Sequence, residues 1–156
     1  MSVGAAFDID CSQIFALANR LQGAAPLIIR DELTTGMNRA TVQVQKYATA
    51  RIKHKSGALG RGFKRQVRVS SNAILGIVSN TAKHAKWVEF GRGPVVAKRA
   101  KVLRFEIDGQ VLFRKSVGPA AAQHFMSGGL RDAEGAIMGE FRASSARIIQ
   151  RVSVLR

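Results

Sequence analysis

The chain has 156 residues, 25 of them Lys or Arg and 10 Asp or Glu, which gives a formal net charge of +15. This length is typical of one domain, and an apolar share of 46% with three prolines excludes a disordered or collagen-like chain. No apolar run approaches the roughly 20 residues that span a bilayer, and the N-terminus lacks the basic-then-apolar order of a signal peptide. We therefore expect the protein to be made and kept in the cytoplasm.

Two helices are expected in the first third of the chain. Ser12 can cap a short helix that Gly23 ends, and Pro26 suits the first turn of the next one. From there apolar residues recur every three or four positions over residues 25–55, with Gly36 as a weak position that costs about 1 kcal/mol against alanine. At 1.5 Å per residue about 28 residues reach about 40 Å, so one end should project or pack on a neighbour.

Two β-hairpins are expected in the middle of the chain, over residues 56–117. The glycine-rich stretch 56–62 should end the long helix, and two strands at 63–69 and 73–79 then follow around a Ser-Ser-Asn turn. After one or two helical turns at 81–90, alternating residues on either side of Asp108-Gly109 predict a second hairpin over 102–117. Strands joined by hairpins are antiparallel.

The remaining residues, 118–156, read as a small-residue loop followed by an amphipathic helix from about Leu130. The sequence thus predicts one α+β domain over residues 1–156, with an N-terminal arm and short helix at 1–24. An antiparallel sheet of about four strands in two hairpins is packed by the long N-terminal helix and the C-terminal helix.

The excess positive charge lies in the central region, because residues 51–115 hold sixteen basic and three acidic side chains. Such a field attracts polyanions, so DNA, RNA or an acidic protein surface could be the partner, as could acidic neighbours on other subunits. Too few aromatic residues interleave with these cations to predict a base-stacking platform. The candidate docking residues are Arg61, Lys64, Arg65, Arg68, Arg92, Lys98, Arg99 and Lys101.

Residues for catalysis or cofactor binding are not visible in the sequence. The three histidines, His54, His84 and His124, have no neighbours at metal-ligand spacing, and the usual phosphate-binding and nucleophile motifs are missing. The single cysteine, Cys11, allows no intrachain disulfide and is expected to be a small, partly buried apolar residue. We expect no enzyme, no cofactor and no metal.

The segment around Glu89 carries the most distinctive pattern. A lone acid between Val88 and Phe90 in the most basic third of the chain is expected to anchor nearby arginines as an ion pair. Trp87 and Phe90 are expected in a core rather than in an interface. The run from Ala85 to Gly91 resembles the "YA.yvE.G" signature of the phage tail-component family typified by the gene-ten product of a lambdoid siphophage.

Two further stretches support this resemblance. Residues 56–63 are similar to the family's "tG.L..s" segment after a long helix, and residues 123–126 are similar to its "P-F-[LM]-x-P-A" element before the last helix. His84 stands in place of the usual tyrosine, and Ser127-Gly128-Gly129 replaces the proline and alanine. The motif-like residues are Trp87, Glu89, Gly91 and Phe125.

The resemblance covers about residues 25–150 and implies a virion protein at the head-to-tail junction of a long-tailed phage, either a tail terminator or a tail-completion (neck) protein. Such proteins assemble as homo-oligomeric rings, commonly hexamers, that contact the tail tube and neck or head-completion proteins around the DNA channel. The alternative that the residues leave open is a basic nucleic-acid-binding domain without a virion role.

Overall fold

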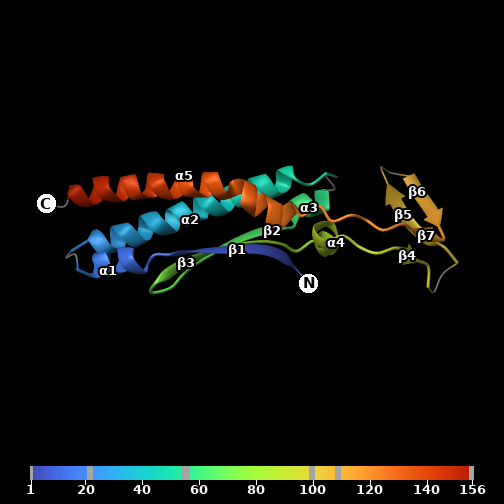
Figure 1. The fold of residues 1–156 in the computed structure, drawn as a ribbon, viewed down its shortest axis with the longest axis horizontal. Coiled ribbons are helices and arrows are strands. Elements are labelled where there is room, and N and C mark those ends of the chain that lie inside the picture. The colour runs from blue at the N-terminus through green and yellow to red at the C-terminus, as the bar shows by residue number, and fades with distance from the viewer. Residues whose placement is uncertain (1, 21–22, 54–56, 99–100, 108–109, 155–156) are drawn as a thin grey trace.

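Two long helices lie side by side over one face of a three-stranded sheet in the computed structural model (Figure 1). The helices are α2 (Ala25–Ala50) and α5 (Phe125–Ser153). The structure describes residues 2–20, 23–53, 57–98, 101–107 and 110–154. The predicted α+β class with long N- and C-terminal helices and antiparallel strands is confirmed.

The main sheet has the strand order β1-β3-β2, formed by β1 (Val3–Asp10), β3 (Ala73–Asn80) and β2 (Phe63–Val69). The hairpin β2–β3 matches the predicted one. The strand β1 was not expected, since residues 1–24 were interpreted as an arm and a short helix. Its signal is an alternation of apolar and small or acidic residues that places Val3 and Ala5 in the core and Asp8 and Asp10 at the surface.

The prediction of one four-stranded sheet is wrong. The second hairpin, β5 (Leu103–Ile107) with β6 (Gln110–Arg114), forms a two-stranded sheet of its own. A further short pair joins β4 (Val95–Val96) to β7 (Ser116–Val117). The third strand of the main sheet is therefore β1, from the opposite end of the sequence, and its Val3 and Ala5 join the core. The turn residues 108–109 lie outside the described residues.

Three short helices connect these elements, and two of them refine the predictions. In α1 (Ser12–Arg20) the cap is Asp10, whose Oδ1 accepts a hydrogen bond from the Ser12 backbone N–H at 2.9 Å and whose pKa is lowered by its hydrogen bonds with Ser12. The glycine-rich stretch expected as a loop contains α3 (Gly57–Arg61). The third helix, α4 (Ala85–Phe90), falls inside the predicted helical turns.

The C-terminal helix begins at Phe125, five residues earlier than expected, and runs along α2. Buried residues of α2 extend from Ala25 to Ala48, so the expectation that one end of the long helix projects beyond its own core is wrong. The reason is that α5, at 29 residues, is long enough to cover α2 over its length. The core accordingly runs along the whole helix pair.

Small residues allow the two long helices to approach each other closely. A Cβ on Gly36 would lie 2.5 Å from the Ser144 Oγ, and one on Gly129 would lie 2.5 Å from the Cα of Ala48. Gly36, expected to weaken α2, is thus the residue that leaves room for α5. Its propensity cost is offset by the close packing that a larger residue would prevent.

A partly buried ion-pair cluster joins the same two helices at Glu32. Its Oε2 accepts from Arg147 Nε at 2.8 Å and its Oε1 from Arg151 Nη1 at 2.9 Å. These hydrogen bonds from arginine, foremost that of Arg147, lower the pKa of Glu32. The carboxylate therefore stabilises the fold above its ordinary pKa of 4.5, and this contribution is lost as the pH falls below 4.5 through the lowered folded-state value.

We expect Glu32→Gln to reduce the stability of the protein at pH 7 and to make it less sensitive to acid. Urea unfolding at intervals between neutral and acidic pH measures this. The wild-type free energy of unfolding should fall more steeply than that of the variant below the ordinary pKa of the carboxyl group. Parallel curves for the two proteins over that range would contradict the assignment.

Candidate functional site

Residues 91–123 form an arm that leaves the body between α4 and α5 and ends in the β5–β6 hairpin, at the end of the molecule opposite the C-terminus (Figure 1). Its two sides are held together by short ladders. Arg92 and Ala120 exchange backbone hydrogen bonds at 2.9 Å each, and β4 pairs with β7 further along. Backbone hydrogen bonds between its own two sides therefore hold the arm together.

The hairpin at the tip of the arm carries apolar side chains on both faces. By register, Phe105 and Leu112 share one face, while Val111 and Phe113 lie on the other. Phe113 is 55% exposed and Val111 42%. A lone two-stranded hairpin is marginally stable in water, and these side chains lack a core to enter. A partner surface that covers these apolar side chains would therefore stabilise the arm.

The structure divides the predicted docking residues between two places. The first four lie on α3 and β2 at the edge of the main sheet, and all are exposed: Arg61, Lys64, Arg65 and Arg68. Arg92, Lys98 and Lys101 lie on the arm. Arg99 lies outside the described residues. The fold does not gather these cations into one patch, and their docking role stays a prediction.

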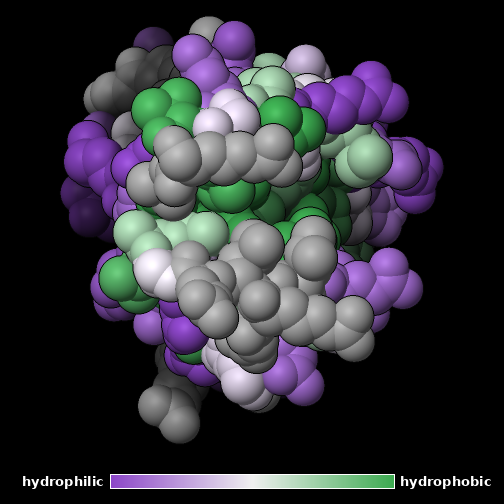
Figure 2. Space-filling view, turned by 90° about the vertical axis from the view of Figure 1, so that its left-hand side faces the viewer, coloured by the Kyte–Doolittle hydropathy of each residue, from purple (hydrophilic) through white to green (hydrophobic). Residues whose placement is uncertain are grey.

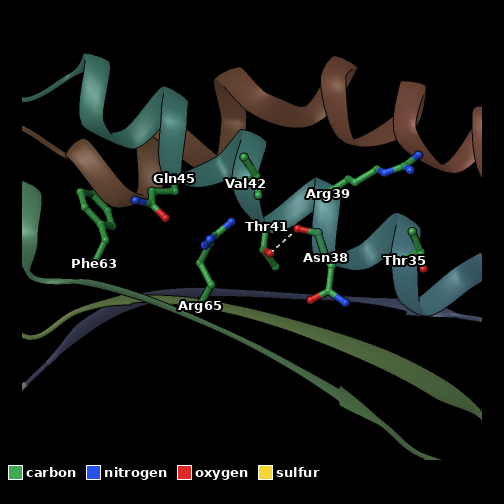
Figure 3. A pocket seen from close by; sticks show the side chains of 8 residues that line it. All are labelled: Thr35, Asn38, Arg39, Thr41, Val42, Gln45, Phe63 and Arg65. Atoms are coloured by element: carbon green, nitrogen blue, oxygen red, sulfur yellow. Dashed lines mark hydrogen bonds between the residues drawn. The ribbon is translucent and has the colours of Figure 1, made fainter. Parts of the chain in front are cut away.

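A groove runs between α2 and the edge strand β2. Figure 3 shows Arg65 reaching from β2 toward α2, and Asn38 reaching from α2 toward the sheet. The lining is largely polar: Thr35, Asn38, Arg39, Thr41, Val42, Gln45, Phe63 and Arg65. Two cations and several amide and hydroxyl groups suit an anionic or hydrogen-bonding occupant.

The other end of the molecule displays a second apolar surface. Figure 2 views this end, where α1 meets the start of α2 and the end of α5, and shows hydrophobic residues gathered in its middle among charged ones. Leu27 is 72% exposed, Ile149 70% and Val154 78%. These exposed apolar residues at the end of the molecule make it a candidate contact region.

Glu89 lies at the base of the arm and is 1% exposed. Its carboxylate accepts hydrogen bonds from the backbone N–H groups of Met126 at 2.7 Å and Ser127 at 3.1 Å, and from Ser127 Oγ at 2.7 Å. It therefore caps the first turn of α5, where the helix dipole favours a negative charge. The expected ion pair with arginines is wrong for the described residues, because helix N–H groups satisfy this carboxylate.

The other motif-like residues have structural positions around this cap. Phe125 is fully buried, with its ring centroid 6.2 Å from that of Phe63 in an edge-to-face contact. Gly91 has a φ of 74°, and a Cβ there would lie 2.7 Å from the Ala120 carbonyl oxygen. The motif thus anchors α5 and starts the arm. No local signal in the sequence marks this cap, because Glu89 lies 37 residues before Met126.

Trp87 and Phe90 are on the surface, and the expectation that they belong to a core is wrong. Trp87 is 52% exposed and Phe90 64%. The short helix α4 buries Ala85 and Glu89, so the aromatic rings point to the sides that nothing covers. Their exposure at the base of the arm adds to the apolar surface of that end.

The described part of the chain contains no cluster of three or more His, Cys, Asp or Glu residues able to hold a metal ion. Among the same residues, no helix is both long and apolar enough to cross a membrane. Cys11 is 1% exposed, and burial, followed by the nearby Asp10 charge, raises the pKa of its thiol. It is therefore more deeply buried than the sequence suggested.

Comparison with protein families matches residues 15–91 to the family described as "Bacteriophage HK97-gp10, putative tail-component". Neither the curated proteins nor the solved structures gave a significant match. The matched residues run from α1 to Gly91, so they include the glycine-rich stretch and the Glu89 motif, while the arm and α5 lie beyond them. A tail component is a structural part of the virion. Over residues 15–91 this chain therefore matches the HK97 gp10-like family, whose description is that of a putative bacteriophage tail component.

Proposed function

We propose that the protein is a ring-forming subunit at the head-to-tail junction of a long-tailed phage, a tail terminator or tail-completion protein without catalytic activity. The observation that supports this is the placement of exposed apolar side chains at two opposite ends. Among the described residues, seven of the fourteen exposed large hydrophobic ones lie on α4 and the arm: Trp87, Phe90, Val95, Val96, Val102, Val111 and Phe113. Four more belong to the far end: Ile14, Leu27, Ile149 and Val154.

Two separated contact regions suit a protein that joins two other structures. The body supplies rigid helices for one contact, and the arm supplies a hairpin that becomes stable when its apolar faces are covered. The partners in this proposal are copies of the chain in a ring, commonly a hexamer, together with the tail tube and the neck or head-completion proteins. Arg92, Lys98 and Lys101 on the arm would meet acidic groups of those proteins or the DNA in the channel.

The arm provides the most direct test of this proposal. We expect phage carrying Phe113→Ser to produce unjoined heads and tails, because truncating a central apolar contact costs a complex about 2 kcal/mol or more. Electron microscopy of the lysate and the titre of infectious particles measure the effect. Phe113 contributes little to the body, so the purified variant should keep the wild-type melting temperature.

The matched control is Met138→Ser. Met138 is 49% exposed on α5 and belongs to neither apolar end, so joining should be unchanged. Normal joining by Phe113→Ser would contradict the docking role of the arm. Absence of the wild-type protein from purified phage particles would contradict the junction role altogether.

Binding of nucleic acid is the second candidate function, and the exposed cations of β2 favour it. Lys64, Arg65 and Arg68 follow one another on an open strand without an acidic neighbour on that strand. Binding of phosphates by these three cations should weaken about fortyfold between 50 and 200 mM salt, whereas a ring closed by apolar burial should persist. Duplex-DNA binding that follows this steep dependence, with no assembly at any salt concentration, would favour this second function.

A further inference from the structure

The main sheet ends in two open edges of opposite charge. Of the described strands, β1 and β2 each pair only with β3, so each leaves one row of backbone hydrogen-bonding groups free. β1 carries Asp8 and Asp10 on the face of the sheet away from the helices, while β2 carries Lys64 and Arg68 on the same face. Open strand edges are templates for pairing with another chain.

We infer that β1 of one subunit pairs with β2 of the next, so that neighbouring copies continue a single β-sheet. This inference rests on the proposed ring and names the surface that would build it. The occupant of each edge is a second copy of this chain, because the same chain carries both the acidic edge and the basic edge. The groove beside β2, lined by α2, leaves that edge accessible.

The registers of the strands bring the opposite charges to one level. Asp8 pairs with Leu75 of β3, and Leu75 pairs with Arg68 of β2, so these three residues form one row across the sheet. A neighbour related by rotation about an axis along the strands would place its Arg68 beside Asp8. Lys64 and Gly4 both pair with Ser79 of β3, so Lys64 of the neighbour would lie beside Gly4. Because glycine has no side chain, there is room for the lysine.

Strand direction and charge both favour a head-to-tail contact over a symmetric one. β1 and β2 are each antiparallel to β3, so they run parallel to each other, and a β1–β2 contact between copies joins two different surfaces. Such contacts repeat from copy to copy and form a ring when the rotation between copies closes. A twofold β1–β1 contact would bring aspartates together, and a β2–β2 contact would bring cations together, which is unfavourable across strands.

Asp8 is available for this contact. It is exposed and takes part in none of the ion pairs between described residues, whereas the neighbouring Asp10 already accepts a hydrogen bond from Ser12. Asp8, Arg68 and Leu75 line one shallow hollow on the uncovered face of the sheet.

A charge exchange tests the inference with full-length protein. Asp8→Lys and Arg68→Glu should each raise the concentration for half assembly by about tenfold, as expected for a repulsive cross-strand pair in every contact. The double variant D8K/R68E restores opposite charges and should assemble as the wild type does. Equal amounts of the two single variants, once mixed, should form rings in which they alternate. Sedimentation velocity and electron microscopy measure assembly.

Controls separate this inference from the proposed function. Glu134→Lys, on the exposed side of α5, changes the net charge as Asp8→Lys does and should assemble normally, and thermal unfolding should show that every variant is folded. The edge pairing is overturned if the wild type forms rings that neither single variant weakens. It is also overturned if the double variant does not restore the assembly that the single variants lose. Either result leaves the proposed ring unaffected. A wild-type protein that stays monomeric overturns both.

Discussion

Replacing Glu89 by alanine should lower the free energy of unfolding by about 3–5 kcal/mol, because it removes a buried charged group on which three donors depend. The N–H groups of Met126 and Ser127 and the Ser127 hydroxyl would lose their acceptor at the start of α5. For a chain of this size the melting temperature should fall by about 10 °C. Chemical denaturation and calorimetry both measure the effect.

Two further variants define the cause. Glu89→Gln keeps one acceptor oxygen and should lose less stability than Glu89→Ala. Glu134→Ala removes an exposed carboxylate from α5, the helix that Glu89 caps, and should change stability by no more than about 0.5 kcal/mol. If Glu89→Ala unfolded within 1 kcal/mol of the wild type, the cap would have no energetic importance and the motif would need another explanation.

The second large effect is expected where α5 crosses the end of α2. Gly129→Ala should destabilise the protein by about 3 kcal/mol, since its Cβ would overlap the backbone of Ala48, 2.5 Å from the Cα and 2.6 Å from the nitrogen. The backbone of a long helix cannot move aside as a flexible side chain can. Urea unfolding measures the loss.

Gly139→Ala is the matched control on the same helix. A Cβ at Gly139 meets nothing within 4 Å, so alanine should stabilise α5 by about 1 kcal/mol through its higher helix propensity. Opposite signs for the two substitutions would show that packing, not propensity, decides at Gly129. Equal stabilisation by both would mean that the two helices do not approach each other this closely.

The helices and the first hairpin could be predicted because their signals are local. Apolar spacing gave α2, and strand alternation gave β2 and β3, with boundaries within a few residues. The sheet to which the second hairpin belongs could not be predicted in the same way. Its alternation is as clear as that of β2 and β3, but which sheet a hairpin joins depends on contacts between distant residues. Alternation in β1 was equally visible, yet residues 1–24 were interpreted as an arm and a short helix.

The candidate site was predictable only in part. The Glu89 motif could be recognised by resemblance, but its role as a cap depends on a contact with residues 126–127, which are distant in sequence. Trp87 and Phe90 were expected inside because large aromatic residues usually are, and the shortness of α4 is what leaves them outside. The charges of the two sheet edges became meaningful only once β1 was known to be a strand.

The pairing of β1 with β3 has a consequence for synthesis on the ribosome. β1 emerges first, yet its partners are about seventy residues further along, from Val3 opposite Asn80 to Asp10 opposite Ala73. Closing so long a loop is slow compared with forming the local β2–β3 hairpin. Until β1 pairs with β3, one edge of the apolar central strand therefore has free backbone hydrogen-bonding groups. Residues 3–10 must pair with this edge before a strand of another nascent chain does.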